Sequence, residues 1–272
     1  MTDPIANPTA DAVGGCALPT FIIIGAQKCA TRWLRINLGE HPDIFTAKSE
    51  MHFWNNGHRV DKLGTDWYRD RFEGWNGEPI VGEATPGYMI WRHHPDFVAE
   101  RMKQHHPEAR LIAILRNPVD RAQSAMMHHI RRDRIPAKSR LVDVVRERNP
   151  PESDWFCLIS GGWYAASLEP FMERFGDRLL VLFHDDVRTD PARPYRAALE
   201  HVGADPSFVP PDLSRIVFSN QGGRAGRRNQ LTPADRIELW EYFRDDVGRL
   251  EKMLGVDLSR WSPEVAAAAA GD

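Results

Sequence analysis

Residues Phe21 to Arg32 constrain the fold of this chain more than any other segment. Four apolar residues, Phe21-Ile22-Ile23-Ile24, end at Gly25, and an amphipathic stretch begins at Thr31. This pattern predicts a buried strand, a tight turn and a helix. Other short apolar runs alternate with amphipathic stretches along the chain, which predicts a parallel sheet covered by helices on both faces.

The predicted strands are 20–24, 80–83, 110–115 and 179–183, and the predicted helices are 31–40, 95–105, 118–132, 163–175, 191–202 and 233–254. We expect a single α/β domain over residues 19–260, because a chain of 272 residues can bury one substantial core. Residues 1–18 and 261–272 lack periodicity, so we expect a disordered tail and a frayed tail there. The charged, proline-containing segment 133–154 has the composition of an excursion or lid.

Composition excludes several classes of protein. A net charge of −3 gives no support for a nucleic-acid partner. The apolar runs are too short to span a bilayer, and the amino terminus has no secretory signal pattern. Three scattered cysteines are too few for a disulfide framework or a zinc site. We therefore expect a cytoplasmic protein without a membrane partner.

The sequence also gives no reason to expect a metal site. Three pairs of adjacent histidines, such as His128-His129, suggest metal binding at first sight. Adjacent residues on a helix diverge by about 100°, so both members of a pair cannot face one ion.

The turn after the first predicted strand has the composition of a phosphate-binding loop. Gly25, Lys28 and Thr31 lie between strand and helix, where backbone N–H groups and the helix dipole attract anions. The turn does not match the Walker pattern G-x-x-x-x-G-K-[ST]. A plain strand-to-helix turn with a surface lysine is the alternative interpretation.

A second polar cluster follows the strand 110–115. Arg116 stands at the end of that strand, Asn117 is a good helix N-cap, and Pro118 suits the first helical turn. Ligands bind beyond the carboxyl ends of strands in open parallel sheets, so Arg116 and Ser124 could hold a second phosphate there. The alternative is a capping turn with a serine on the helix surface.

Carboxylates outside these loops supply candidates for a general base. Glu50 and His52 point to the same side of the chain if it is extended, and the neighbouring Phe53 and Trp54 predict a partly apolar setting. Such a setting raises the pKa of a carboxyl towards that of a useful base. A surface strand with ordinary charges is the alternative. Glu83 ends the strand 80–83 and either faces the crevice or accepts structural hydrogen bonds.

Taken in order, these motifs resemble those of sulfotransferases that use 3′-phosphoadenosine 5′-phosphosulfate (PAPS). The resemblance is greatest to the heparan sulfate N- and 3-O-sulfotransferase branch and extends from about residue 20 to about residue 254. The motifs are Gly25-x-x-Lys28-x-x-Thr31, Ser49-Glu50-Met51-His52-Phe53-Trp54, Glu83-x-Thr85-Pro86-x-Tyr88 and Arg116-Asn117-Pro118-x-x-Arg121-x-x-Ser124.

The resemblance implies a fold related to P-loop kinases and transfer of a sulfuryl group to a hydroxyl or amine. The acceptor would be carbohydrate-like or a hydroxylated small molecule, the product nucleotide adenosine 3′,5′-bisphosphate (PAP), and no metal would be required. Glu50 would be the base, and Lys28, His52 and Ser124 the other catalytic residues.

The resemblance also assigns binding residues. The 5′-phosphosulfate would be held by Gly25, Ala26, Gln27, Lys28, Cys29, Ala30, Thr31 and Arg32, and the 3′-phosphate by Arg116, Ser124, Gly223 and Arg224 or Arg227. Acceptor contacts would come from Glu83, Tyr88, His128 and Trp54.

The sequence departs from the family pattern in four places. Cys29 and Ala30 partly replace the usual small residue before Thr31, which is a mild change. Ala84 and Gly222 replace lysines that are usual in the family, and the cysteine pair of secreted members is missing. The missing pair agrees with a cytoplasmic, bacterial-like enzyme. Two alternatives stay open: an ATP-dependent P-loop kinase, favoured by the Walker B-like Asp185-Asp186, and a non-catalytic nucleotide- or glycan-binding protein.

Overall fold

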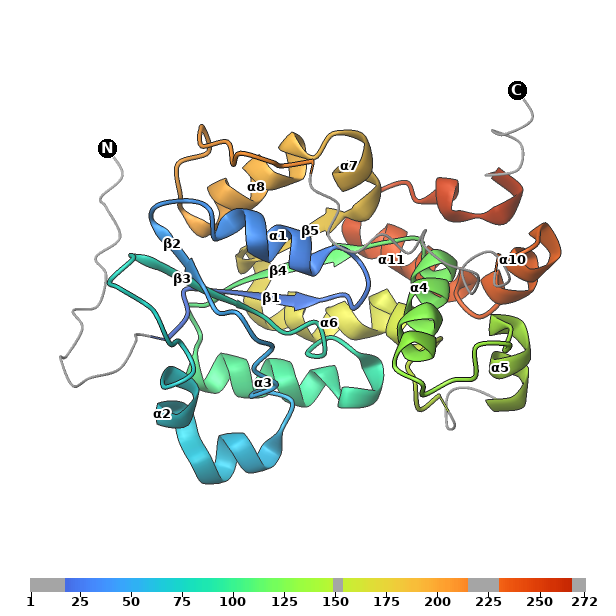
Figure 1. The fold of residues 1–272 in the computed structure, drawn as a ribbon, viewed down its shortest axis with the longest axis horizontal. Coiled ribbons are helices and arrows are strands. Elements are labelled where there is room, and N and C mark those ends of the chain that lie inside the picture. The colour runs from blue at the N-terminus through green and yellow to red at the C-terminus, as the bar shows by residue number, and fades with distance from the viewer. Residues whose placement is uncertain (1–17, 149–153, 215–229, 266–272) are drawn as a thin grey trace.

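The computed structural model describes residues 18–148, 154–214 and 230–265 and is built around a five-stranded parallel sheet (Figure 1). The strands lie in the order β2-β3-β1-β4-β5, so the first strand is central. Their bounds are β1 Phe21–Gly25, β2 Ile44–Thr46, β3 Ile80–Ala84, β4 Arg110–Leu115 and β5 Leu179–Phe183. The predicted α/β fold with a parallel sheet is confirmed.

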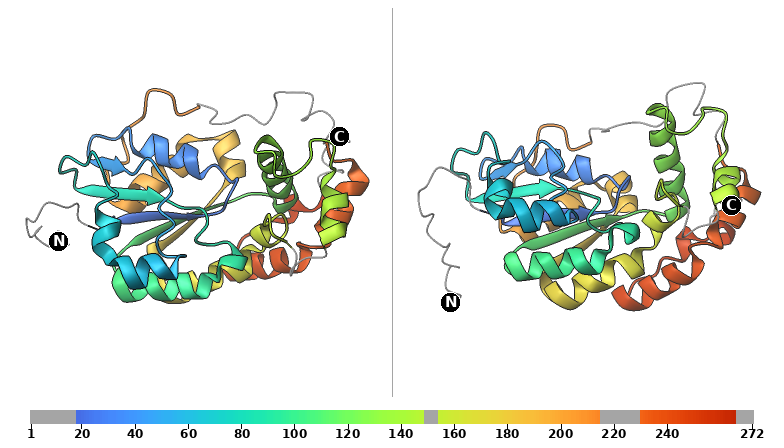
Figure 2. Two further views of the ribbon diagram at one scale, coloured as in Figure 1. Left: turned by 60° about the horizontal axis from the view of Figure 1, so that its bottom comes forward. Right: turned by 90° about the horizontal axis from the view of Figure 1, so that it is seen from below.

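Helices cover both faces of the sheet, and a further group of helices lies beyond the carboxyl ends of the strands. Figures 1 and 2 show α1 and α8 on one face, α3 and α6 on the other, and α4, α5 and α10 beyond the carboxyl ends of the strands. The α-helices are α1 Thr31–Leu38, α2 Gly64–Arg69, α3 Pro95–His105, α4 Pro118–Arg131, α5 Leu141–Arg148, α6 Tyr164–Phe175, α7 His184–Thr189, α8 Ala192–Val202, α10 Pro233–Trp240 and α11 Arg244–Leu254. A π-helix, η1 Arg59–Leu63, precedes α2, and the 3₁₀ turns are η2 Trp91–His93, η3 Ser160–Gly162, η4 Gly176–Arg178 and η5 Ser259–Trp261. No helix in these ranges is long and apolar enough to cross a membrane.

The central strand is apolar because it is buried on both faces of the sheet. Every residue of β1 is buried, and the strand pairs with β3 on one side and with β4 on the other. Gly82 lies opposite Phe21, and a Cβ atom built on this glycine would come within 2.0 Å of the Phe21 ring. Only glycine therefore lets β3 and β1 approach at this position.

Sequence periodicity located four of the five strands and the five helices α1, α3, α4, α6 and α8, but it missed shorter elements. β2 has only three residues, and α2 and α7 have six each. The prediction of one helix over 233–254 was wrong, because the chain turns between α10 and α11. In that turn Phe243 is buried, and the Tyr242 carbonyl accepts a hydrogen bond from Trp163 Nε1 at 2.9 Å.

Two boundary predictions also need correction. The segment 133–154 is not simply an excursion, because α5 lies within it and buries Leu141, Val142 and Val145 in the core. Arg140 Nη2 donates to both carboxylate oxygens of Asp235 on α10 at 2.8 Å, which ties the start of α5 to that helix. The predicted frayed tail from residue 261 begins at a buried tryptophan, so the packed domain includes Trp261.

The start of α4 is fixed by the predicted cap. The Asn117 Oδ1 atom accepts from the backbone N–H of Val119 at 3.0 Å and of Asp120 at 3.3 Å, while its Nδ2 donates to the Trp261 carbonyl at 2.9 Å. This side chain therefore anchors the helix that carries Ser124 and also the end of the packed domain.

Replacing Asn117 with alanine is expected to lower the free energy of unfolding by about 1–2 kcal/mol, because the cap is lost. Asn117→Asp is the comparison variant, since it keeps the capping oxygen but replaces the donor to the Trp261 carbonyl with a negatively charged oxygen. Urea denaturation of both variants measures the difference. Equal stability of Asn117→Ala and the wild type would show that the cap contributes nothing.

Candidate functional site

The candidate site lies where the strand order reverses. β1 connects through α1 towards β2, whereas β4 connects towards β5 on the other side of the sheet. The loops after β1 and β4 therefore leave a crevice at their carboxyl ends, the usual ligand position in such sheets. Lys28 follows β1 and Arg116 follows β4, so the structure brings the two predicted phosphate-binding loops together.

The backbone of the Lys28 loop is shaped for an anion. Lys28 and Ala30 both have φ of 73°, in the left-handed region. Ala30 is the N-cap of α1 and makes no side-chain cap, and the first turn of α1 contains no acidic residue. Uncapped N–H groups at a helix start attract anions. The predicted loop thus has the geometry of an anion-binding turn.

Lys28 lies in a strongly cationic environment. Burial, followed by the charges of Arg131 and Arg116, lowers the pKa of Lys28 to about 8. Arg121 acts in the same direction. Neighbouring positive charges create a potential that attracts anions, so this cluster is suited to a polyanionic ligand.

Arg116 and α4 form the second wall of the crevice. Arg116 Nη1 donates to the Lys28 carbonyl at 3.5 Å, and the Arg116 carbonyl accepts from Tyr164 Oη at 2.9 Å. Ser124 is buried on α4, and His128 follows one turn later on the same side of the helix. Burial and the charge of Lys28 lower the pKa of His128 to about 4, so its imidazole is neutral near pH 7 and close to Lys28.

Glu50 and His52 are brought together, though not in the way the sequence suggested. His52 Nε2 lies 3.1 Å from Glu50 Oε2. The segment is not a strand, and His52 has φ of 47°. The expected apolar setting of Glu50 was wrong, since its side chain is 56 % exposed and that of His52 is 44 % exposed. Phe53 and Trp54 instead point into the core, where both are buried.

Three predicted acceptor contacts are fully buried. Glu83, Tyr88 and Trp54 have no exposed surface. Glu83 accepts hydrogen bonds from three hydroxyl groups, which matches the structural alternative considered for it. A ligand could reach none of these side chains without displacing their neighbours, so we do not retain them as acceptor contacts. His128 is partly exposed and stays a candidate.

The remaining residues that were predicted to bind PAPS lie in the turn after β1, at the start of α1 and outside the described residues. Gly25 ends β1, and the Ala26 N–H donates to the Ile114 carbonyl at 2.9 Å. Cys29 has no exposed surface, and its thiol lies 3.6 Å from Tyr164 Oη. Gln27 and Thr31 lie in the same turn, and Arg32 is exposed on α1. Gly223, Arg224 and Arg227 lie outside the described residues.

Sequence reasoning missed three charged or ionisable neighbours of the site. Arg131, the last residue of α4, is the charge that most lowers the pKa of Lys28. Its position in the sequence could have identified it, because Arg131 lies two helical turns after Ser124 on α4. Arg35 on α1 interacts with the charge of Glu50, and His184 at the start of α7 interacts with that of Arg116.

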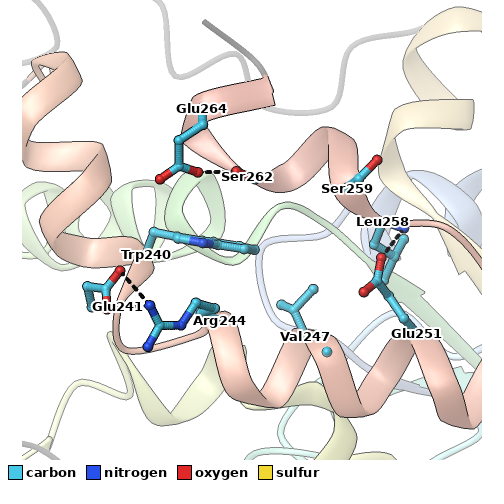
Figure 3. Close-up of a pocket in the computed structure, with 10 residues that line it drawn as sticks. Trp240, Glu241, Arg244, Val247, Glu251, Leu258, Ser259, Ser262 and Glu264 are labelled. Atoms are coloured by element: carbon cyan, nitrogen blue, oxygen red, sulfur yellow. Dashed lines mark hydrogen bonds and ion pairs between the residues drawn. The ribbon is translucent and has the colours of Figure 1, made fainter.

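Other features of the described residues do not point to a different site. No group of three His, Cys, Asp or Glu side chains within these ranges could hold a metal ion. A cavity of about 380 Å³ lies between α10, α11 and η5 (Figure 3). Its charged groups pair locally, as in the Arg244–Glu241 ion pair at 3.0 Å. None of the predicted site residues lines this cavity.

Comparison with known proteins agrees with this geometry. Residues 18–250 match the family described as "Sulfotransferase domain". The structure of a sulfotransferase from Alicyclobacillus acidocaldarius superimposes with a TM-score of 0.74 at 29% identity, covering 90% of this chain and 99% of that one. The fold and the family match together define a sulfotransferase domain.

Curated relatives show the same affiliation. Mouse heparan sulfate glucosamine 3-O-sulfotransferase 3B1 is 31% identical over 192 residues, which are 70% of this chain and 47% of that protein. Mouse bifunctional heparan sulfate N-deacetylase/N-sulfotransferase 1 is 29% identical over 90% of this chain and 31% of its own length. This chain spans less than half the length of these relatives. The chain belongs to the sulfotransferase domain family.

Proposed function

We propose that this chain transfers a sulfuryl group from PAPS to a hydroxyl or amine of an acceptor. The observation that carries the proposal is the meeting of the Lys28 and Arg116 loops at the uncapped start of α1, where Arg116 Nη1 donates to the Lys28 carbonyl at 3.5 Å. PAPS carries negative charge at two separate ends, and the two loops after β1 and β4 offer cations at two adjacent positions. Family membership supports the same donor.

The residues support an in-line transfer. Lys28 would offset negative charge on the leaving phosphate, as cations do in the related transfer of phosphoryl groups. Glu50 would take the proton from the acceptor, and His52, 3.1 Å away, would hold the carboxylate in place. Since Glu50 is more than half exposed, a bound acceptor would cover it and remove water from the reacting groups.

Exposed aromatic side chains lie around η2, which follows β3 in the chain. A cavity of about 450 Å³ beside η2 and the start of α3 is lined in part by Trp91, Arg92 and Phe97. Trp91 is 39% exposed and Trp155 is 70% exposed, and the Arg92 guanidinium lies 4.8 Å from the Trp155 ring centroid. Exposed aromatic rings suit sugar rings or flat molecules, which supports a carbohydrate-like or hydroxylated small-molecule acceptor.

The kinase alternative has weaker support. Asp185, part of the Walker B-like pair, lies in the first turn of α7, where its Oδ2 accepts from Trp261 Nε1 at 2.9 Å and pairs with Arg260 at 3.2 Å. This carboxylate is therefore engaged in joining α7 to η5.

A transfer assay tests the proposed function. The protein is incubated with PAPS labelled in the sulfuryl group and a panel of amino sugars, oligosaccharides and hydroxylated aromatic compounds. We expect label in at least one acceptor and release of PAP in equal amount. Transfer from labelled ATP to the same panel, with none from PAPS, would support the kinase; binding without any transfer would support a non-catalytic protein.

Arg116→Ala is expected to weaken binding of PAP by about 10- to 100-fold, because a charged hydrogen-bonding partner of the 3′-phosphate is lost. Binding of adenosine 5′-phosphate, which lacks that phosphate, should be nearly unchanged. Calorimetric titration of both nucleotides measures the difference, with Arg249→Ala on α11 as a control for loss of one positive charge. Equal weakening of both nucleotides by Arg116→Ala would contradict this position for the 3′-phosphate.

A further inference from the structure

Glu83 is the centre of a closed hydrogen-bond network that lies beneath the Glu50–His52 segment. Its Oε1 atom accepts from Tyr68 Oη at 2.9 Å and from Tyr88 Oη at 2.8 Å, while Oε2 accepts from Thr85 Oγ1 at 2.7 Å. The carboxyl group has no exposed surface. A buried carboxylate is costly unless its oxygens are satisfied in this way.

Two of the three hydroxyl groups also hold the segment that carries the proposed base. Thr85 Oγ1 accepts from the Met51 N–H at 2.8 Å and from the His52 N–H at 3.4 Å. Tyr88 Oη accepts from the Phe53 N–H at 3.1 Å. Each of these hydroxyls has one proton, so it can receive the backbone N–H groups only if its own proton points elsewhere. Both hydroxyl protons point towards the Glu83 carboxylate, which accepts them.

The third hydroxyl provides an internal comparison. Tyr68 Oη donates to Glu83, but no hydrogen bond joins it to the backbone of residues 51–53 among the described contacts. Its ring stacks on Phe53 with centroids 4.6 Å apart. Removing this hydroxyl therefore weakens the solvation of Glu83 without releasing a backbone N–H group of residues 51–53.

We propose that Glu83 is a positioning residue of the transfer reaction. As a carboxylate it fixes the hydroxyl protons of Thr85 and Tyr88, so their oxygens hold residues 51–53 and thereby the pair Glu50 and His52. This inference rests on the proposed function, because it assigns Glu50 the role of base. Arg59 also holds this segment, because its Nη1 atom donates to the Met51 and His52 carbonyls.

The charge of Glu83 is consistent with this role. Burial raises the pKa of Glu83 to about 7, against the opposing effect of the three hydroxyl donors and of His52. The ionisable groups that face it are Tyr68 from α2, Tyr88 from the loop after β3 and His52 from the loop after β2. The hydroxyl bonds keep a substantial carboxylate fraction near neutral pH, and only this form accepts from all three hydroxyls.

The test compares Thr85→Val and Tyr88→Phe with Tyr68→Phe. Each of the three removes one buried hydroxyl bonded to Glu83, but only the first two release N–H groups of residues 51–53. We expect Thr85→Val and Tyr88→Phe to lower kcat by about 10- to 100-fold, the scale of a small misplacement of a catalytic group. PAP affinity and the KM for PAPS should stay nearly unchanged. Tyr68→Phe should lower kcat least of the three, because it weakens the solvation of Glu83 but frees no backbone N–H group of residues 51–53. Thr85→Ser, which retains the hydroxyl, should restore kcat.

The outcomes separate this inference from the proposed function. If the wild type transfers sulfuryl groups and all three hydroxyl variants have equal kcat, Glu83 has no positioning role and the inference is overturned. If Thr85→Val loses PAP affinity in proportion to kcat, the network supports the fold generally, and the inference is again overturned. A wild type that neither binds PAP nor transfers sulfuryl groups would instead overturn the proposed function.

Discussion

Glu50→Gln is expected to lower turnover by about 10²- to 10⁴-fold, because glutamine cannot take the proton of the acceptor. Affinity for PAP should remain nearly unchanged, since Glu50 lies on the loop after β2 and the proposed nucleotide-binding loops follow β1 and β4. Steady-state turnover of labelled PAPS, measured together with calorimetric titration of PAP, separates the two effects.

The matched control for this variant is Glu73→Gln, which removes an exposed carboxylate after α2 and should leave turnover unchanged. The 3.1 Å contact between Glu50 and His52 also predicts that His52→Ala lowers turnover less than Glu50→Gln, because it removes a positioning partner. A Glu50→Gln protein that kept its turnover but lost PAP affinity would show that Glu50 belongs to the nucleotide site and is not the base.

Lys28→Met is expected to reduce turnover by about 10²- to 10³-fold and to weaken PAP binding, because the cation at the leaving phosphate is lost. The wild type should also bind PAP less tightly as pH rises through about 8, where the free protein loses the Lys28 proton. A bound anion favours the charged ammonium, so binding near pH 8 should take up a proton. Lys28→Arg keeps the charge and should not show this pH step.

The lowered pKa of Lys28 also predicts how the free energy of unfolding changes with pH. The pKa of Lys28 is lower in the folded protein than the ordinary value of 10.5, so between about pH 8 and that value the unfolded chain binds more protons. Stability of the nucleotide-free wild type should therefore rise with pH across this window relative to Lys28→Met. Urea unfolding of the wild type and of Lys28→Met at pH 7 and pH 9.5 measures this change. If the wild type instead lost stability relative to Lys28→Met at the higher pH, the burial of a charged Lys28 would be contradicted.

The sequence was most informative where one local pattern determines one element. The run Phe21–Ile24 with Gly25 predicted β1 and its turn, and Asn117-Pro118 predicted the start of α4; the structure confirms both. Periodicity missed β2 because three residues cannot establish a pattern. It missed the break before α11 because Phe243 leaves the helix to enter the core through tertiary contacts.

The sequence identified several residues of the candidate site but not which of their side chains are buried. Proximity of Glu50 and His52 was inferred from an extended chain, whereas a left-handed His52 produces it. The burial of Glu83 depends on Tyr68, which arrives from α2 in a separate segment. Such long-range contacts leave no periodic signal in the sequence. Arg131 lies two turns after Ser124, and helical spacing could have included it.

Equilibrium titration with two nucleotides is the most direct test of the central claim that this chain is a PAPS-dependent sulfotransferase. PAP is titrated into the protein in the presence of a chelator, and ATP is titrated in the presence of Mg²⁺, each also with Lys28→Met and Arg116→Ala. We predict that PAP binds without metal, that it binds more tightly than ATP with Mg²⁺, and that both variants weaken it. Tight binding of ATP with Mg²⁺ and no measurable binding of PAP would contradict the claim.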